Sequence, residues 1–371
     1  MKNKIKLNQL TGLRYFAALL VFASHTSWNN SHEFFMRFFQ QGYVGVSFFF
    51  ILSGFVLSYS YKEKIKNQSL EFKKYALLRL ARLTPLHLLT ALPFIFYAFF
   101  TDQNYTIIKT IFNLSYLQSW IPISSFYFSL NAPSWSLSNE MFFYLCFFPL
   151  AMFSFRRVVF LILALSAVVF ISAMIVYCFM DGRVFVGGYT FAHWLFYIFP
   201  GFRLLEFLTG MLLFEIWKSG YRLNIVSMPF AYIFLAVAMW FAIDIPESFR
   251  LSLYYLPFIA FFLYTHLTDD SLVNKFYSSK SMILLGNASF AFYLIHQPII
   301  SILKWLLNSI EISDFYFFIT SLLLTTLASV MTYLIYERRA EGYLKKLINN
   351  SSFFKPREFS ETEHNVGVRP L

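Results

Sequence analysis

Charged residues are scarce in this chain of 371 residues. They make up 13% of the sequence, whereas a soluble globular domain contains about 25%. Hydrophobic residues account for 58% and aromatic residues for 22%, which is more apolar surface than a soluble core of this length can bury. The composition excludes an ordinary soluble protein and predicts a protein that crosses a membrane several times.

Disulfide bonds and β-structure are also unexpected. Only two cysteines are present, Cys146 and Cys178, and both lie inside hydrophobic runs, so no disulfide framework is implied. The runs lack the alternation of apolar and polar residues that marks a membrane-spanning β-barrel. They are continuous and about 20 residues long, the length of a helix that crosses the hydrocarbon layer. We therefore predict an all-α, polytopic membrane protein.

Ten hydrophobic segments predict about ten transmembrane helices. They cover residues 10–28, 43–61, 83–100, 136–155, 158–180, 201–217, 224–243, 251–267, 281–307 and 315–336. The segment 105–134 is apolar but contains Pro122 and Pro133, so we expect a long loop that folds partly back into the protein. No internal repeat is evident.

Lysine and arginine are distributed unevenly between the connecting segments, and they give a net charge of +11. Most of them lie on the side of the N-terminus, and the opposite side has only Arg37, Lys109, Arg183 and Arg250. Because basic loops stay in the cytoplasm, we expect both termini to be cytoplasmic. Basic residues that lie in loops between spans also argue against binding of nucleic acid.

The first hydrophobic segment is expected to be retained in the mature protein. Arg14 lies within it, and no small-residue cleavage site of a signal peptide follows. No second globular domain fits the sequence. We expect residues 1–348 to form one integral-membrane domain and the polar residues 349–371 to form a disordered cytoplasmic tail.

Two ionisable residues in this first segment indicate a functional site. A charged side chain in a membrane helix costs about 2.5 kcal/mol or more. Helical rise separates Arg14 from His25 by about 16 Å, so Arg14 lies near the inner face and His25 in the outer half. Histidine can act as a base or nucleophile near neutral pH, and arginine binds phosphate or carboxylate groups.

Other ionisable residues are expected at the depth of His25. Glu140 lies near the start of an inward-running helix, and Arg203 and Glu206 lie in another. His296 lies in the outer half of an outward-running helix. These five side chains meet at one level if their helices face a common interior. The alternative is a set of polar contacts that only hold the helices together.

A second group of charges is expected at the inner face. Arg79 and Arg82 precede the third predicted helix and follow a basic stretch that begins at Lys62. They either anchor the chain at the membrane surface or, together with Arg14, bind an anionic cytosolic cofactor. Glu337 is a candidate partner for one of these arginines.

Small residues inside the apolar segments allow another helix or a ligand chain to approach closely. Gly54, which follows Ser53, lies in the second segment. Gly210 and Gly286 occupy similar positions in later segments. Such positions are typical of helix packing in membranes.

Six stretches occur in a characteristic order. They are LTGLRYFAALLVFASH (10–25), GYVGVSFFFILSGFVLS (42–58), LLRLARLTPLHLL (77–89), PSWSLSNEMFFYL (133–145), RLLEFLTGMLL (203–213) and LGNASFAFYLIHQP (285–298). Together they resemble the membrane acyltransferase-3 family of bacterial surface-glycan acyltransferases. The family signatures are an arginine, ten further residues and a histidine in the first helix, and Trp-Ser-Leu, two further residues and a glutamate in the fourth. Asn139 stands where the family usually has a small residue.

The resemblance implies a membrane O-acyltransferase of the bacterial cytoplasmic (inner) membrane. It would move an acyl group, usually acetyl, from cytoplasmic acyl-coenzyme A to a hydroxyl of a cell-surface or lipid-linked glycan. His25 would be the catalytic histidine, Arg14 its motif partner and Glu140 the acidic residue of the second motif. No metal ion enters this scheme.

The resemblance also suggests roles in detail. Arg79 and Arg82, with Arg14, would bind the phosphates of acetyl-coenzyme A. His25 would deprotonate the acceptor hydroxyl or take the acyl group itself, and Glu140 would orient its imidazole. The remaining ionisable residues of the outer level are candidates for contacts to the acceptor; they are Arg203, Glu206 and His296.

Two further questions concern partners and alternatives. Some family members carry a C-terminal esterase-like domain, which we expect this chain to lack, so the membrane domain or a polysaccharide-assembly partner would complete the transfer.

The main alternative is a proton-coupled transporter, because buried ionisable residues also mark such carriers. Transporters often contain internal repeats and paired broken helices, and neither is evident here.

Overall fold

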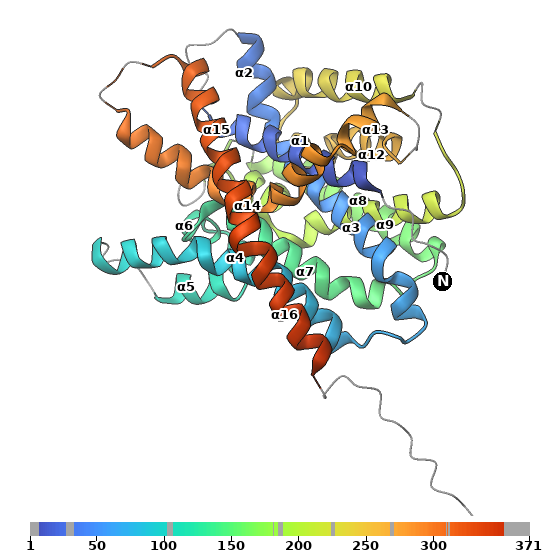
Figure 1. The fold of residues 1–371 in the computed structure, drawn as a ribbon. Coiled ribbons are helices and arrows are strands. Elements are labelled where there is room, and N and C mark those ends of the chain that lie inside the picture. Colours follow the sequence, from blue (N-terminus) through green and yellow to red (C-terminus); the bar gives the residue numbers. More distant parts are fainter. Residues whose placement is uncertain are drawn as a thin grey trace, which may run out of the picture.

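The computed structural model describes residues 7–26, 33–101, 107–180, 182–184, 188–223, 227–267, 271–308, 310 and 312–351. These residues are mostly helical (Figure 1), and within them the only β-pairing is an isolated bridge between Val184 and Thr190. The α-helices are α1 (Asn8–Ser24), α2 (Glu33–Phe39), α3 (Val44–Lys66), α4 (Phe72–Thr101), α5 (Ile107–Leu114), α6 (Ser124–Tyr127), α7 (Trp135–Leu150), α8 (Phe155–Met180), α9 (Pro200–Lys218), α10 (Ser227–Phe241), α11 (Glu247–Phe249), α12 (Leu256–Thr265), α13 (Leu272–Tyr277), α14 (Lys280–Leu306), α15 (Asp314–Thr332) and α16 (Arg338–Asn350). π-Helical turns occur at His193–Ile198, Arg250–Tyr254 and Tyr333–Glu337.

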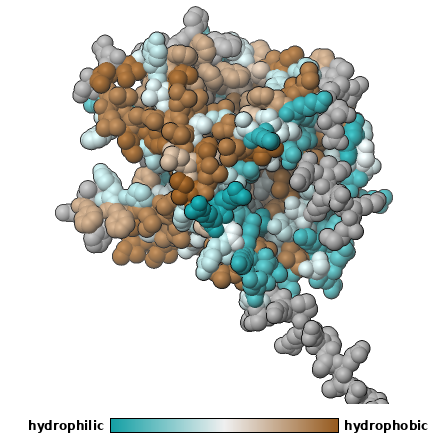
Figure 2. Space-filling model, in the orientation of Figure 1, coloured by the Kyte–Doolittle hydropathy of each residue, from teal (hydrophilic) through white to brown (hydrophobic). Residues whose placement is uncertain are grey.

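Seven helical segments in the described part of the chain are long and apolar enough to cross a membrane. They are Phe35–Lys66, Phe72–Ala98, Phe155–Met180, His193–Lys218, Ser227–Asp244, Lys280–Leu306 and Asp314–Asn350. Apolar residues cover much of the face over α4, α5, α14 and α15 (Figure 2). The all-α, multi-pass architecture is confirmed.

The other three predicted spans are also helical but shorter. α1 has 17 residues, α7 has 16 and α12 has 10. A helix rises about 1.5 Å per residue, so each of them is shorter than the hydrocarbon layer is thick. That these three helices cross the bilayer, and that both termini are cytoplasmic, stay predictions.

The predicted loop at 105–134 is partly helical where it is described, which corrects that expectation. It contains α5 and α6, and two buried amides hold it, one within the segment and the other to α14, which confirms that it folds back into the protein. The Nδ2 atom of Asn113 donates to the Ser129 carbonyl at 2.7 Å, and that of Asn131 donates to the Leu294 carbonyl of α14 at 2.8 Å. Buried amides of this kind satisfy backbone groups that a loop would leave unpaired.

The predicted C-terminal tail lies almost entirely outside the described residues. Its first residues belong to α16, which continues the long helical segment that begins with α15 (Figure 1). Residues 352–371 are not described. The division of the chain at 348 stays a prediction.

Glycines allow two pairs of helices to touch through their backbones. A Cβ atom on Gly54 of α3 would lie 2.0 Å from the Phe207 carbonyl oxygen of α9, and one on Gly210 of α9 would lie 1.9 Å from the Ile51 carbonyl oxygen. A Cβ atom on Gly286 of α14 would lie 1.8 Å from the carbonyl oxygen of Thr11 in α1. The predicted close approach is thus confirmed as helix packing.

We expect Gly54→Ala and Gly210→Ala to destabilise the protein, because α3 and α9 must separate to admit the methyl group. Overpacking of this kind costs about 1–3 kcal/mol. Thermal unfolding of the purified protein in detergent measures the change. The matched control is Gly342→Ala in α16, where no atom lies within 4 Å of the new Cβ. Equal melting temperatures for all three variants would contradict the packing role.

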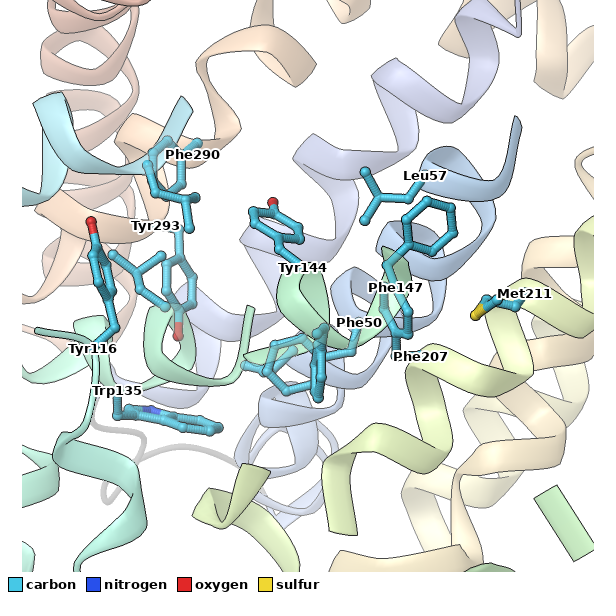
Figure 3. Close-up of a cluster of buried hydrophobic side chains, with 14 of the residues drawn as sticks. Phe50, Leu57, Tyr116, Trp135, Tyr144, Phe147, Phe207, Met211, Phe290 and Tyr293 are labelled. Atoms are coloured by element: carbon cyan, nitrogen blue, oxygen red, sulfur yellow. The ribbon is translucent and has the colours of Figure 1, made fainter. Parts of the chain in front are cut away.

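The core between α3, α7, α9 and α14 is aromatic (Figure 3). The ring of Phe143 packs 5.0 Å from that of Phe50 and 5.2 Å from that of Phe207, measured between centroids. Tyr144 and Tyr293 belong to the same cluster. Part of this core forms the walls of two cavities, which are described next.

Candidate active site

A cavity of about 400 Å³, here named the histidine cavity, lies at the end of α1. Its polar lining consists of Ser24, His25, Gln40, His193, Glu247, Arg250, His296 and Gln297. Its aromatic lining consists of Tyr43, Phe128, Trp135, Tyr189, Tyr197 and Tyr293. The volume lies within the usual range of small-molecule sites, and the lining offers both hydrogen bonds and stacking faces.

His25 is positioned by the backbone of its own helix. It forms the C-terminal cap of α1, and its Nδ1 atom lies 2.8 Å from the Val21 carbonyl oxygen. Because a carbonyl only accepts, Nδ1 carries the hydrogen of this bond. A neutral imidazole then has its lone pair on Nε2, where it can serve as a base or nucleophile. Glu140 does not line this cavity, so the expectation that it orients this ring stays a prediction without a contact to support it.

A second histidine lies beside the first. The ring centroids of His25 and His296 are 4.9 Å apart. His296 belongs to α14, is fully buried, and has its Nδ1 atom 2.6 Å from the Tyr293 carbonyl oxygen. Its Nε2 atom has no hydrogen-bond partner. The predicted grouping of His25 with His296 is thus present in the structure.

A smaller cavity of about 70 Å³, here named the arginine pocket, adjoins the histidine cavity. Its polar lining consists of Arg14, Arg82, Ser136, Glu140, Tyr144 and Ser289. The Tyr144 hydroxyl donates to Glu140 at 2.9 Å. Val46 and Tyr293 line both cavities and so form the wall between them.

Arg14 is left without a direct partner in this pocket. Within the described part of the chain, its guanidinium makes no hydrogen bond and no ion pair, although Arg82 and Glu140 line the same pocket. Guanidinium groups in proteins are almost always charged and carry five N–H donors. Arg14 therefore has donors available for an anionic or carbonyl oxygen of a ligand.

The other two predicted donor-binding arginines already have partners. Arg82 donates from Nη1 to Glu337 at 2.6 Å and to Glu341 at 2.8 Å, which confirms the expected partnership of Glu337 with an arginine. Arg79 donates to the Tyr61 hydroxyl at 2.5 Å. Because this hydroxyl is neutral, the bond does not balance the positive charge of Arg79. That Arg14, Arg79 and Arg82 bind the phosphates of acyl-coenzyme A stays a prediction.

Arg203 and Glu206 form a buried pair within α9. Their side chains are 2.9 Å apart, and Arg203 also donates to the Ser47 hydroxyl at 3.2 Å. Neither residue lines the histidine cavity. The expected meeting of five ionisable side chains at one level is therefore wrong in part, because they separate into the two histidines, Glu140 beside Arg14, and this pair. An acceptor contact through Arg203 or Glu206 stays a prediction without a contact to support it.

The sequence-based prediction missed one histidine and two charged residues of the histidine cavity. His193 packs against Tyr189 with ring centroids 4.7 Å apart. A lone histidine in the apolar run FAHWLFYIF carries the same signal as His25 and could have been noticed. Glu247, which accepts from the Thr190 hydroxyl at 2.7 Å, and Arg250 lie in a connection without such a signal. Among the described residues, no group of three or more His, Cys, Asp or Glu side chains could hold a metal ion.

Comparison with known proteins agrees with the family features of the sequence. The family model described as "Acyltransferase domain" matches residues 7–334. The acyltransferase MdmB of Streptomyces mycarofaciens is 30% identical over 80% of this chain and 79% of its own length. The O-acetyltransferase OatA of Staphylococcus aureus is 26% identical over 97% of this chain, and the peptidoglycan O-acetyltransferase OatA of Listeria monocytogenes is 24% identical over 79%.

The coverage of the relatives differs. This chain spans 60% of the Staphylococcus protein and 49% of the Listeria protein. No solved structure matches the chain. The family match covers nearly all of the described helices, including those that hold His25, Glu140 and His296. The chain therefore belongs to the acyltransferase-3 family.

Proposed function

We propose that this protein moves an acyl group, in the simplest case acetyl, from cytoplasmic acyl-coenzyme A to a hydroxyl of a cell-surface or lipid-linked glycan. The setting is the bacterial cytoplasmic membrane. The observation that carries the proposal is the pair of adjoining cavities, one with an available imidazole nitrogen on His25 and the other with the unpaired guanidinium of Arg14. Membership of an acyltransferase family favours this function over a transporter.

The size of the arginine pocket limits how the donor can bind. A volume of about 70 Å³ holds only about two water molecules, so it accepts a slender chain but no nucleotide. The nucleotide of coenzyme A would remain at the mouth of the pocket, near Arg79, and the pantetheine arm would enter. The thioester must then pass the wall formed by Val46 and Tyr293 to reach His25.

The lining of the histidine cavity suits a glycan acceptor. Flat aromatic side chains such as Tyr189 and Trp135 can stack on the apolar faces of a sugar ring. Gln40, Gln297 and Glu247 can bond its hydroxyls, and buried polar groups of this kind discriminate against ligands that lack the matching partner. The named activities of the OatA relatives, O-acetyl transfer and action on peptidoglycan, support a glycan acceptor and an acetyl group.

An apolar groove supports a lipid-linked form of the acceptor. It measures about 840 Å³, lies between α4 and α14, and includes Leu89, Phe94 and Ile302 in its lining. It shares Ala132 and Gln297 with the histidine cavity. A sugar in the cavity could thus keep its hydrocarbon anchor in the groove.

The test uses membranes from cells that express the protein and matched membranes that lack it. With [1-¹⁴C]acetyl-coenzyme A, the expressing membranes are expected to release coenzyme A and to incorporate label into the glycan or lipid-linked glycan fraction. Mass spectrometry of that fraction should show the added mass of an acetyl group, removable by mild alkali as for an ester. Absence of both label and coenzyme A release would refute the proposed function.

A further inference from the structure

The histidine cavity contains three imidazoles, those of His25, His193 and His296, where a single-base mechanism requires one. If His25 only deprotonated the acceptor, one imidazole would be enough. His296 nevertheless lies in the same cavity with its ring 4.9 Å from that of His25, at an interplanar angle of 69°. The rings are thus neighbours in an edge-to-face arrangement.

Both rings are held in the same manner. The Nδ1 atom of His25 bonds the Val21 carbonyl, and that of His296 bonds the Tyr293 carbonyl. Because both carbonyls are acceptors, each neutral ring has its hydrogen on Nδ1 and its lone pair on Nε2. The cavity therefore contains two basic nitrogens of fixed tautomer, on two helices that are locked together at Gly286.

The Nε2 atom of His296 is buried and has no protein partner. An unsatisfied buried polar atom costs about 1–3 kcal/mol, which an apolar side chain of similar size would avoid. A hydroxyl bound in the cavity would remove this cost by donating to Nε2. His87 also has a buried ring nitrogen without a partner, but it does not line the histidine cavity, so it serves as a matched control.

We propose that the two histidines divide the reaction, with Nε2 of His25 carrying the acyl group and Nε2 of His296 acting as the general base toward the acceptor hydroxyl. This inference rests on the proposed acyl transfer. His25 is assigned the nucleophile because it is partly exposed in the cavity, whereas His296 is fully buried. His25 also shares α1 with Arg14, which lines the adjoining pocket.

The first step forms a C–N bond and breaks the C–S bond. The Nε2 lone pair of His25 attacks the thioester carbonyl, coenzyme A leaves as a thiolate, and the ring becomes an acylimidazolium that keeps its Nδ1 hydrogen on the Val21 carbonyl. Once acylated, His25 has no lone pair left to act as a base. A second group must therefore accept the proton of the acceptor, and His296 has the free nitrogen for it.

The second step returns both rings to their starting state. The acceptor oxygen attacks the acyl carbon, its proton passes to Nε2 of His296, and the C–N bond to His25 breaks. The proton on His296 is then transferred to the coenzyme A thiolate, directly or through solvent. The sum is thioester plus alcohol giving ester plus thiol, with no other reactant.

The inference is tested by rapid-quench kinetics on the purified, full-length protein in detergent. The donor is [1-¹⁴C]acetyl-coenzyme A, and water serves as the acceptor. The wild type is expected to release a burst of coenzyme A comparable to the amount of protein, followed by slow turnover. In His296→Gln the burst and protein-bound label should persist, while turnover after the burst falls about a hundred-fold or more, the usual contribution of a general base.

Controls separate this inference from the proposed function. His87→Gln should behave as the wild type, and size-exclusion profiles identify folded protein. If His296→Gln does not fold, His296→Asn and mapping of the quenched label on the wild-type peptide replace it. Label on His296, or turnover of a folded His296 variant close to that of the wild type, would overturn the division of roles. Failure of the wild type to release coenzyme A would instead refute acyl transfer itself.

Discussion

His25→Ala is expected to abolish acyl transfer while the protein remains inserted and folded. The substitution removes the Nε2 atom that would meet the thioester or the acceptor hydroxyl, and loss of such a group costs about a hundred-fold or more in rate. The loss in stability should be small, because His25 is partly exposed in the cavity and caps only the end of α1. Transfer of labelled acetyl, normalised to folded protein, measures the effect.

His266 provides the control for this substitution. Its Nδ1 atom bonds the Phe262 carbonyl at 2.8 Å, in the same way as His25 bonds Val21, but its Nε2 atom is already bonded to the Tyr232 hydroxyl at 3.0 Å. His266→Ala should therefore retain transfer per folded molecule. Undiminished transfer by well-expressed His25→Ala would remove His25 from the chemistry and, with it, the proposed site.

The separation of Arg14 from His25 along their own helix could be predicted from the sequence because helical rise is constant. Arg14 and His25 occupy different cavities along α1, as their separation required. Rotation about each helix axis could not be predicted. Glu140 lies on α7, whose sequence is apolar on nearly every side, so no stripe indicated which neighbour it would meet. Glu140 shares a pocket with Arg14 and Arg82, which we expected at the inner face, so its expected depth beside His25 was wrong as well as its expected neighbour.

A charge pair between residues close in the sequence could be recognised from the sequence, whereas a contact between residues far apart in the sequence could not. Arg203 and Glu206 are three residues apart on one helix, a spacing at which opposite charges meet. Their mutual pairing could have been predicted in place of an acceptor contact. By contrast, the entry of Glu247 into the histidine cavity depends on the path of the chain between α10 and α12, and no local pattern encodes that path.

The contacts of the glycines could be predicted only in part. Gly54, Gly210 and Gly286 marked helix faces that need close approach, and the structure has such contacts at each. The identity of the partner helix was not predictable, because the carbonyl that fills the space belongs to backbone and has no sequence signature. The same two helices, α1 and α14, also carry the two neighbouring histidines, one at the end of α1 and the other within α14.

Arg14→Lys and Arg14→Met are expected to raise the KM for acyl-coenzyme A with little change in the rate at saturating donor. Arg14 is the arginine of the pocket that has no hydrogen bond or ion pair among the described residues, so its donors are available to the ligand. A hydrogen bond to a charged group contributes about 1.5–3 kcal/mol, which corresponds to a rise in KM of about 10-fold to 150-fold. Lysine should restore little, because it cannot make the planar, two-point contact of a guanidinium.

Arg82→Ala should behave differently, because Arg82 is already bonded to Glu337 and Glu341. Its loss leaves Glu337 buried without a counter-charge, which costs about 3–5 kcal/mol of stability, and adding Glu337→Gln should recover part of that loss. Saturation curves for the donor and melting curves in detergent thus separate the two arginines. A lowered melting temperature with unchanged KM for the Arg14 variants would make Arg14 a structural charge like Arg82. The donor would then have to bind by the uncompensated charge of Arg79, the remaining arginine of the inner group.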